Sequence, residues 1–367
     1  MFFKDIVGQQ SIAQKLRYTF TGGRLGHATL FTGKEGYGAL PLALAMSRYI
    51  MCRNRTEFDS CGVCLSCKKF DKLIHPDMHF IFPVVNKKGK DPVSDSFIAE
   101  WRKFLSNNVY ATNNDWIREI ATENSKGNIY KDESDSINRK LNMKSFEGDY
   151  KIMIIWMAEK MSDITANKIL KILEEPPQNT FFFLIAVQPE QLLQTIISRT
   201  QVISIPPIDA VDVTNFLCTK YDLDIAKAAD LALYSEGDLA KSIELIDRVD
   251  ELQQNIENFN KFINFSKNEQ TTEIWDFINS TLDKGINSYI EFLSYILHNI
   301  RHNILETLNP NYNNQIIKNN NAIKLNITFQ QGKAIYKLLN EAIFHIERNV
   351  YPQLVLFDVS LQIKRML

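Results

Sequence analysis

Short apolar segments alternate with segments of helical spacing over roughly the first two hundred residues. Three of them, Ala28–Thr32, Lys151–Ala158 and Phe181–Val187, have the length of a strand and almost no polar interruption. Continuous apolar runs of this length are typical of parallel strands that are buried on both faces. Helical spacing is found in Pro41–Ile50, Thr165–Leu173 and Gln191–Arg199. This alternation predicts an α/β core, in which helices cover both faces of a parallel sheet.

Turn-forming residues are concentrated in the same part of the chain. Eleven of the 14 glycines and nine of the 11 prolines precede Ile208, and Pro206 and Pro207 stand where the composition changes. Because few helix-breaking residues follow, the remainder of the chain is predicted to be helical. Within it, Asn309–Asn321 holds seven asparagines in 13 residues, a composition typical of an exposed loop between helices.

A polar stretch, from about residue 86 to residue 150, interrupts the alternation of strands and helices. Two segments inside it, Ser94–Asn107 and Glu133–Phe146, have helical periodicity and are predicted to form helices. Its basic group of Lys87, Lys88 and Lys90 is interpreted as solvated surface. No function is predicted for this insert.

The chain has 367 residues, of which 45% are hydrophobic and 23% charged, as in an ordinary globular protein. At about 100–200 residues per domain, this length predicts two or three domains. The 42 basic and 43 acidic residues disfavour a protein that coats nucleic acid, because such binding needs concentrated Lys and Arg. No apolar run approaches the ~20 residues that span a bilayer, and no secretory signal is recognised. We therefore expect a cytoplasmic protein without a membrane segment.

Four of the five cysteines, Cys52, Cys61, Cys64 and Cys67, have the spacing C-x8-C-x2-C-x2-C. Overlapping C-x2-C steps let thiolates converge on one ion, and four thiolates complete a tetrahedral zinc shell. Because a closed shell leaves no position for water, the predicted Zn²⁺ site is structural. Two alternatives remain: free cysteines on a loop, and an iron–sulfur cluster, which is disfavoured because no proline follows Cys67.

A glycine-rich segment follows the first predicted strand and has the frame of a phosphate-binding loop. Its glycines are Gly33, Gly36 and Gly38, but the next two positions are Ala39 and Leu40. An active loop carries a lysine there to neutralise phosphates and a hydroxyl to ligate magnesium. We therefore expect a degenerate loop, and ATP is an improbable ligand.

The strand that should carry acidic residues for magnesium and water also lacks them. Ile152–Ile155 continues into Trp156, and the first carboxylate is that of Glu159. The nucleotide site would thus lack its lysine, its hydroxyl and its acids together. These three losses argue against ATP hydrolysis more strongly than any one of them.

Several further segments occur in a fixed order: Asp5–Gln9, Arg24–Ala28, the glycine loop, the four cysteines, His75–Asp77, Leu173–Pro177 and Thr195–Thr200. In this order they resemble the AAA+ subunits of the bacterial DNA polymerase III clamp loader, over residues 1 to about 250. The silent loop resembles the delta-prime branch of this family more than its gamma/tau ATPases.

The resemblance implies three domains: an AAA+ core over residues 1–207 with the cysteine module at about 52–67, a helical lid over 208–250, and a helical collar over 251–367. It also implies a ring of five subunits, shared with gamma/tau and delta subunits. Such rings load the sliding clamp onto primed DNA. Contacts with the clamp and DNA are expected mainly through the complex.

The resemblance further implies a role for Ser198 and Arg199. They match a family segment that supplies an arginine finger to the ATP site of the neighbouring subunit, although Thr200 replaces the usual cysteine. From the residues alone, Arg199 could equally complement the end of its own helix. Ala240 and Val187 stand where active members sense nucleotide, which again fits a silent subunit.

Two other functions remain as alternatives. The first is an active gamma/tau-like ATPase, which the missing lysine and acids disfavour. The second is a zinc-dependent DNA-binding protein, which the near-zero net charge and the lack of aromatic residues within Cys61–Cys67 disfavour.

Overall fold

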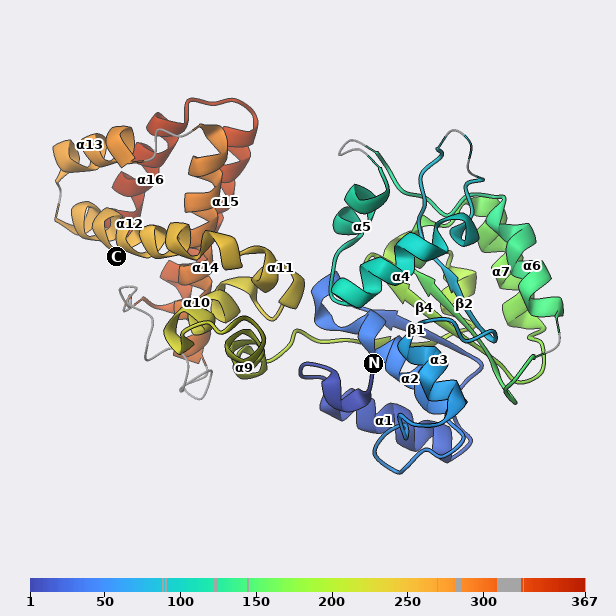
Figure 1. Ribbon diagram of the computed structural model, residues 1–367. Helices are drawn as coiled ribbons and strands as arrows, with labels where there is room; N and C mark the ends of the chain where they lie inside the picture. Colours follow the sequence, from blue (N-terminus) through green and yellow to red (C-terminus); the bar gives the residue numbers. More distant parts are fainter. Residues whose placement is uncertain are drawn as a thin grey trace. The chain divides into compact units, whose positions relative to one another are not determined.

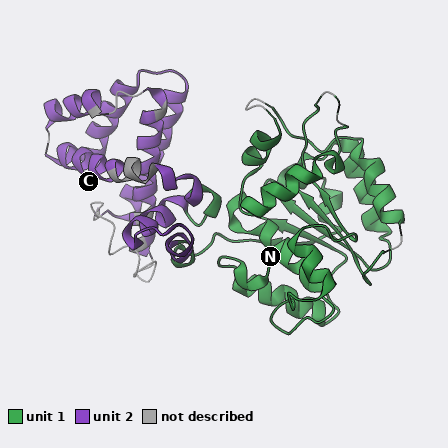
Figure 2. Ribbon diagram, in the orientation of Figure 1, with its two compact units in different colours: residues 1–213, 236–241 green, residues 214–235, 242–367 purple. Residues whose placement is uncertain are grey.

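The computed structural model describes residues 1–366 apart from 88, 90, 122–124, 144, 269, 282–284, 309–324 and 326. The expected loop at Asn309–Asn321 and the side chains of Lys88 and Lys90 lie outside the described residues. The chain divides into two compact units (Figure 2): residues 1–213 with 236–241, and residues 214–235 with 242–367. The finer division at residues 207 and 250 stays a prediction.

The first unit is built on a sheet of five parallel strands (Figure 1). The strands are β1 (Ala28–Thr32), β2 (Met78–Ile81), β3 (Lys151–Trp156), β4 (Thr180–Ala186) and β5 (Gln201–Ser204). Their order in the sheet is β2-β3-β4-β1-β5, and all four neighbouring pairs are parallel. The predicted parallel sheet is confirmed, with β1 between β4 and β5.

Helices pack on both faces of this sheet, so that the successive residues of β3 enter two different cores. Ile152 and Ile154 belong to the core on one face, whereas Met153 and Ile155 belong to the core on the other. The helices on the first face are α1 (Gln10–Thr21), α2 (Ala39–Met51), α3 (Leu65–Asp71), α4 (Ile98–Asn107) and α5 (Asn113–Ile120). Those on the second are α6 (Glu133–Asn142), α7 (Asp163–Glu174) and the short α8 (Gln194–Ile197). Burial on both sides explains the unbroken apolar runs in the sequence.

The segment Gln191–Arg199 differs from its prediction as one helix. It contains the end of a 3-10 turn, Pro189–Gln191, and then only the four residues of α8. Between them, Leu192 and Leu193 have extended or irregular backbone, and Leu192 is buried in the second core. The burial of Leu192 accompanies the break in the helical pattern.

The polar insert contributes to the first core instead of forming a separate appendage. Its expected first helix is a 3-10 turn, Ser94–Phe97, followed by α4, and its second ends early, as α6. Trp101 of α4 is fully buried, with its ring stacked on that of Phe82 at 4.3 Å between centroids. Trp116 of α5 packs edge-on to Trp101 at 5.1 Å. These aromatic rings attach the insert to the sheet.

Asp77, of the segment His75–Asp77, closes the insert onto the sheet. Its carboxylate is 2% exposed and accepts hydrogen bonds from the backbone amides of Phe146, Glu147 and Gly148, at 2.5, 2.9 and 3.1 Å. A carboxylate that accepts three amide hydrogen bonds is strongly held. This segment therefore has a structural role, because it joins the end of the insert to the start of β2.

In the described residues of the second unit, every secondary-structure element is a helix, and the unit has its own core. The helices leading to it and forming it are α9 (Ala210–Tyr221), α10 (Ile225–Ser235), α11 (Leu239–Glu244), α12 (Val249–Lys267), α13 (Thr271–Thr281), α14 (Ile286–Leu308), α15 (Phe329–Glu347) and α16 (Pro352–Met366). The helix pair α14 and α15 approaches closely at Gly332, where a Cβ atom would lie 2.4 Å from the Ile304 side chain. No helix of the described chain is both long and apolar enough for a membrane crossing.

We predict that Asp77→Asn destabilises the first unit, because an amide offers one acceptor oxygen and turns two donors toward amides that also donate. The expected loss is about 1–3 kcal/mol of unfolding free energy. Hydrogen exchange at the amides of Phe146–Gly148 and the thermal midpoint measure it. Asp149→Asn, at an exposed neighbouring carboxylate, is the matched control. Equal protection in the two variants would contradict this role of Asp77.

Candidate functional site

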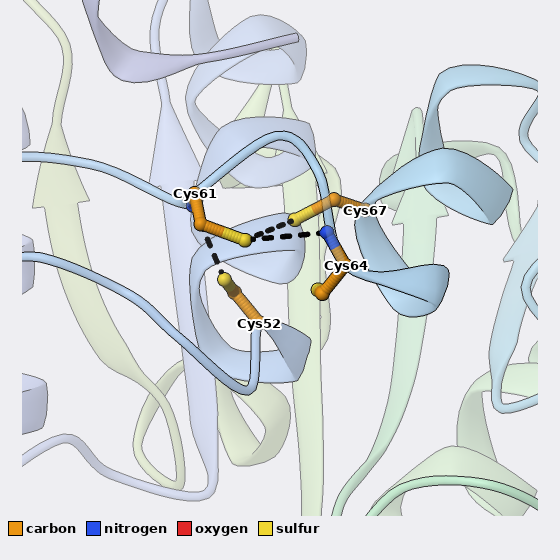
Figure 3. A group of neighbouring side chains, drawn as sticks. All are labelled: Cys52, Cys61, Cys64 and Cys67. Carbon is orange, nitrogen blue, oxygen red and sulfur yellow. Dashed lines mark hydrogen bonds between the residues drawn. The ribbon is translucent and has the colours of Figure 1, made fainter.

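The four clustered cysteines converge in space (Figure 3). Cys52 follows the last residue of α2, Cys61 lies in the loop that follows, Cys64 is the N-cap of α3, and Cys67 lies within α3. All four sulfur atoms lie within 4.8 Å of one another, and those of Cys61 and Cys67 are 4.0 Å apart. Sulfurs about 2.3 Å from one tetrahedral ion lie roughly 3.8 Å apart. The cluster is thus close to the geometry of a metal shell and could hold one ion.

Backbone amides donate hydrogen bonds to two of the sulfurs, an interaction that by itself favours the thiolate form. The amide of Cys61 donates to Cys52 Sγ at 3.2 Å, and that of Cys64 to Cys61 Sγ at 3.4 Å. Gly62 has φ +74°, which lets the chain turn between these ligands, and a Cβ there would meet the Phe2 ring at 2.8 Å. The sequence spacing predicted the cluster, but not the dependence of its turn on Gly62.

The thiols respond differently to this environment. Burial raises the pKa of the Cys52 thiol to about 12, so that without a cation Cys52 stays protonated at neutral pH. At Cys61, burial acts in the same direction, but amides of Cys64 and Val63 that donate to its sulfur lower the pKa to about 6. A bound cation would favour deprotonation of every ligand. The donor set, four sulfurs and no oxygen, fits a soft or borderline ion.

The glycine loop runs from the carboxyl end of β1 to the start of α2. Gly38 has φ +97° and is the N-cap of α2, which begins at Ala39 and not at Pro41 as the sequence suggested. Ala39 and Leu40 are 3% and 4% exposed and belong to the first core. At the positions where a phosphate loop carries its lysine and hydroxyl, this chain has core residues.

Acidic and backbone groups lie against this loop. A Cβ on Gly36 would lie 1.8 Å from Oδ1 of Asp238 and 2.7 Å from the amide of Ala240, so the segment that holds both residues packs directly on the loop. Burial raises the pKa of Glu35 to about 6, the Asn113 amide that donates to it at 2.5 Å opposes this, and the charge of Asp238 adds to the increase. These carboxyl groups disfavour a phosphate anion.

The carboxyl ends of β3 and β4 lie at the same edge of the sheet. Trp156, at the end of β3, is buried, with its ring 5.0 Å from that of Trp101. Glu159 accepts hydrogen bonds from the amides of Val187 and Gln188, at 3.0 and 3.3 Å. The first carboxylate after β3 therefore bonds to the end of the neighbouring strand.

Ser198 and Arg199 lie at the opposite edge of the sheet. Gln201, the first residue of β5, pairs with Thr29 of β1, whereas the glycine loop starts at Gly33. At about 3.3 Å per residue, the strand separates the two by roughly 13 Å. The structure thus brings Ser198 and Arg199 together, but it keeps both apart from the glycine loop of the same chain.

The guanidinium of Arg199 is held by its surroundings and is still 37% exposed. Its Nη2 forms an ion pair with Glu174 Oε1 at 2.8 Å, at the end of α7. Its Nη1 donates to the Thr195 carbonyl at 3.1 Å and to Ser198 Oγ at 3.4 Å. Sequence reasoning missed Glu174 as a partner, although the expected end of α7 at this residue was a signal.

His27 connects the same helix end to β1. Its Nε2 lies 3.0 Å from the carbonyl of Leu173, and the amide of Gly26 donates weakly to the Gln201 side chain at 3.5 Å. Three of the segments that carried the sequence resemblance therefore meet at the amino ends of β1 and β5. These segments are far apart in the sequence but lie at one place in the fold.

The fold and the cysteine cluster define a class: a protein with a parallel α/β core, a glycine loop after its first strand and an inserted tetracysteine module. A family model described as "DNA polymerase III, delta subunit" matches residues 8–209. The chain belongs to this family of clamp-loader proteins.

Curated relatives include both branches of the family. The chain is 30% identical to DNA polymerase III subunit delta' of Escherichia coli over 53% of this chain and 46% of the relative. It is 29% identical to subunit delta' of Bacillus subtilis, over 56% and 50%. It is 24% identical to subunit tau of E. coli, over 67% and 32%. The chain thus spans half or less of the length of these relatives.

We predict that Cys64→Ser releases a bound metal and lowers the thermal midpoint of the first unit. A hydroxyl is a poor replacement for a thiolate ligand, and the metal's binding energy also stabilises the fold. Metal content after gel filtration and the midpoint with and without a chelator measure the effect. Cys218→Ser, outside the cluster, is the control. A chelator-insensitive wild-type midpoint would contradict the prediction.

Proposed function

We propose that this chain is a non-catalytic, delta-prime-like subunit of the DNA polymerase III clamp loader. In a five-membered ring with gamma/tau and delta subunits, it completes a neighbour's ATP site with Arg199 while the ring loads a sliding clamp on primed DNA. One observation carries the proposal. The exposed arginine lies at the opposite ends of the strands from the glycine loop of the same chain, and this supports a role at the nucleotide of another chain.

The surroundings of the loop support the silent role. Ala39 and Leu40 pack in the core, and Glu35 and Asp238 present carboxyl groups where phosphates would need cations. No step of ATP hydrolysis can be assigned to these residues. The chain's own loop is proposed to act as a rigid part of the subunit.

Zinc is the metal proposed for the cysteines. Four sulfur ligands from Cys52, Cys61, Cys64 and Cys67 suit Zn²⁺, which favours tetrahedral thiolate shells in structural sites. With all four positions filled by protein, the ion would have no open site for water and would contribute folding energy. It would join the end of α2 to α3.

The contacts of Arg199 suggest how the finger would work. The side chains of its ion pair with Glu174 are 37% and 45% exposed, and such exposed pairs are worth only about 0–1 kcal/mol. A neighbour's γ-phosphate could therefore displace Glu174 at little cost. Before a neighbour binds, Glu174 would hold the guanidinium toward solvent. Without Glu174, the guanidinium would bond only to the end of its own helix.

We predict that Arg199→Ala lowers the DNA-stimulated ATP turnover of the reconstituted ring but leaves ring assembly intact. Fingers acting in trans elsewhere are worth about 10³–10⁵ in rate, and a ring with several ATP sites would show less. Arg199→Lys should restore little, because an ammonium lacks the planar fork. Arg118→Ala, at an exposed arginine elsewhere, is the control. Wild-type turnover and clamp loading by Arg199→Ala would reduce Arg199 to a helix-end residue.

Glu174→Ala should lower the same turnover about two- to fivefold, because the guanidinium would no longer be held toward solvent by an interaction worth at most about 1 kcal/mol. The ring's KM for ATP should be unchanged, because Glu174 acts only through Arg199. Glu175→Ala, the adjacent exposed carboxylate, is the matched control. Equal turnover in the two variants, alongside an impaired Arg199→Ala, would reject Glu174 and leave the finger in place.

The isolated chain should not hydrolyse ATP above background, since the groups that neutralise phosphate and hold magnesium are absent. Steady-state phosphate release by highly purified protein tests this. A turnover that a Gly36→Ala substitution abolishes would favour the alternative of an active gamma/tau-like ATPase.

A further inference from the structure

A buried cation lies beside the cysteine cluster without enough partners for its N–H groups. Arg48, in the last turn of α2, has a side chain that is 1% exposed. Its Nη1 donates to Asp71 Oδ1 at 2.6 Å, but its Nε and Nη2 are buried and have no hydrogen-bond partner among the described residues. A buried guanidinium with unused donors is costly, unless an anion that these contacts do not include stabilises it.

The position of Arg48 follows that of the cysteines. On α2, Arg48 precedes Cys52 by four residues, and on α3, Asp71 follows Cys67 by four. Residues four apart lie on the same face of a helix. The Arg48–Asp71 ion pair therefore joins the two helices about one turn from the point where the sulfurs of Cys52 and Cys67 meet.

Two further contacts define the direction of the guanidinium. Its Cζ lies 3.8 Å from the centroid of the Phe2 ring, so one face of the group is covered. Its Nη2 lies 3.7 Å from the position that a Cβ on Gly62 would occupy, beside the turn between Cys61 and Cys64. The unpartnered Nη2 is therefore on the side of the cysteine turn.

The charge of an occupied cluster provides the missing anion. Four thiolates around one divalent cation carry a net charge of −2, and the sulfurs of Cys52 and Cys67 are buried. Hydrogen bonds and charges around the ligands of a metal commonly set its affinity.

We propose that Arg48 is the buried counter-ion of the tetracysteine metal centre, directing its free N–H groups at the thiolates and neutralising half of the net charge of the occupied site. This inference rests on the proposed zinc site. Asp71 then has a secondary role: it holds one end of the guanidinium and competes with the thiolates for its charge. At 49% exposure, the Asp71 carboxylate is well solvated and can stand alone.

The test measures Zn²⁺ affinity of the full-length chain by competition with a chromophoric chelator. Arg48→Met should weaken zinc binding about 10–100-fold, as loss of an outer partner of a metal ligand does elsewhere. Arg48→Lys, of similar length to Met but charged, should lose clearly less. Asp71→Asn should bind zinc as tightly as the wild type or more tightly. Arg53→Met, at an exposed arginine nearby, should match the wild type.

The experiment distinguishes a failure of the proposed zinc site from a failure of the proposed role of Arg48. If the wild-type chain binds no zinc, the metal itself is rejected. If zinc binds but Arg48→Met keeps wild-type affinity, or loses no more than Arg48→Lys, the charge of Arg48 is not required. If Asp71→Asn weakens binding as much as Arg48→Met, the ion pair is only a structural link. If Arg48→Met does not fold, zinc binding by Asp71→Asn that is clearly weaker than that of the wild type still overturns the proposal.

Discussion

The parallel pairing of β1 with β4 and β5 is the constraint on which the rest of the first unit depends. Because all neighbouring strands run in one direction, every segment after a strand lies at one edge and every segment before a strand lies at the other. The glycine loop, Glu159 and Val187 belong to the carboxyl edge, while His27 and Arg199 belong to the amino edge. One chain thereby has the glycine loop at the carboxyl ends of its strands and the exposed cation Arg199 at their amino ends.

Burial explains which strands the sequence could predict. The residues of β3 are all buried and those of β4 nearly so, which leaves unbroken apolar runs. In contrast, β5 is an outermost strand of the sheet with three of its four residues exposed, and β2 has only four residues. Neither strand therefore produces an apolar pattern that can be recognised in the sequence. The prediction of one helix over Gln191–Arg199 is wrong because Leu192 fits a helical pattern of apolar positions, although its backbone is extended where its side chain packs into the core.

The site could be predicted where its residues are neighbours in sequence. The cysteine spacing is local, since Cys61, Cys64 and Cys67 lie within one loop and the start of one helix. The partners of Arg199 and Arg48 depend on which helices come together, and the sequence does not give the distances between helices. Glu174 is 25 positions from Arg199 in the chain but 2.8 Å from it in space. Contacts such as that of Glu174 with Arg199, between a helix end and the amino end of a strand, can therefore be identified only from a structure.

The helix α2 joins the glycine loop to the cysteine module. All 13 of its residues are buried. An active phosphate loop would place a lysine and a hydroxyl where Ala39 and Leu40 are. With those groups replaced by core residues, the start of α2 is packed against the sheet. Its end is joined to α3 through Arg48 and Cys52. At about 1.5 Å per residue, α2 spans roughly 20 Å between the two sites. Packing at the start of α2 and the contacts with α3 at its end both support the proposal of a rigid, non-catalytic subunit.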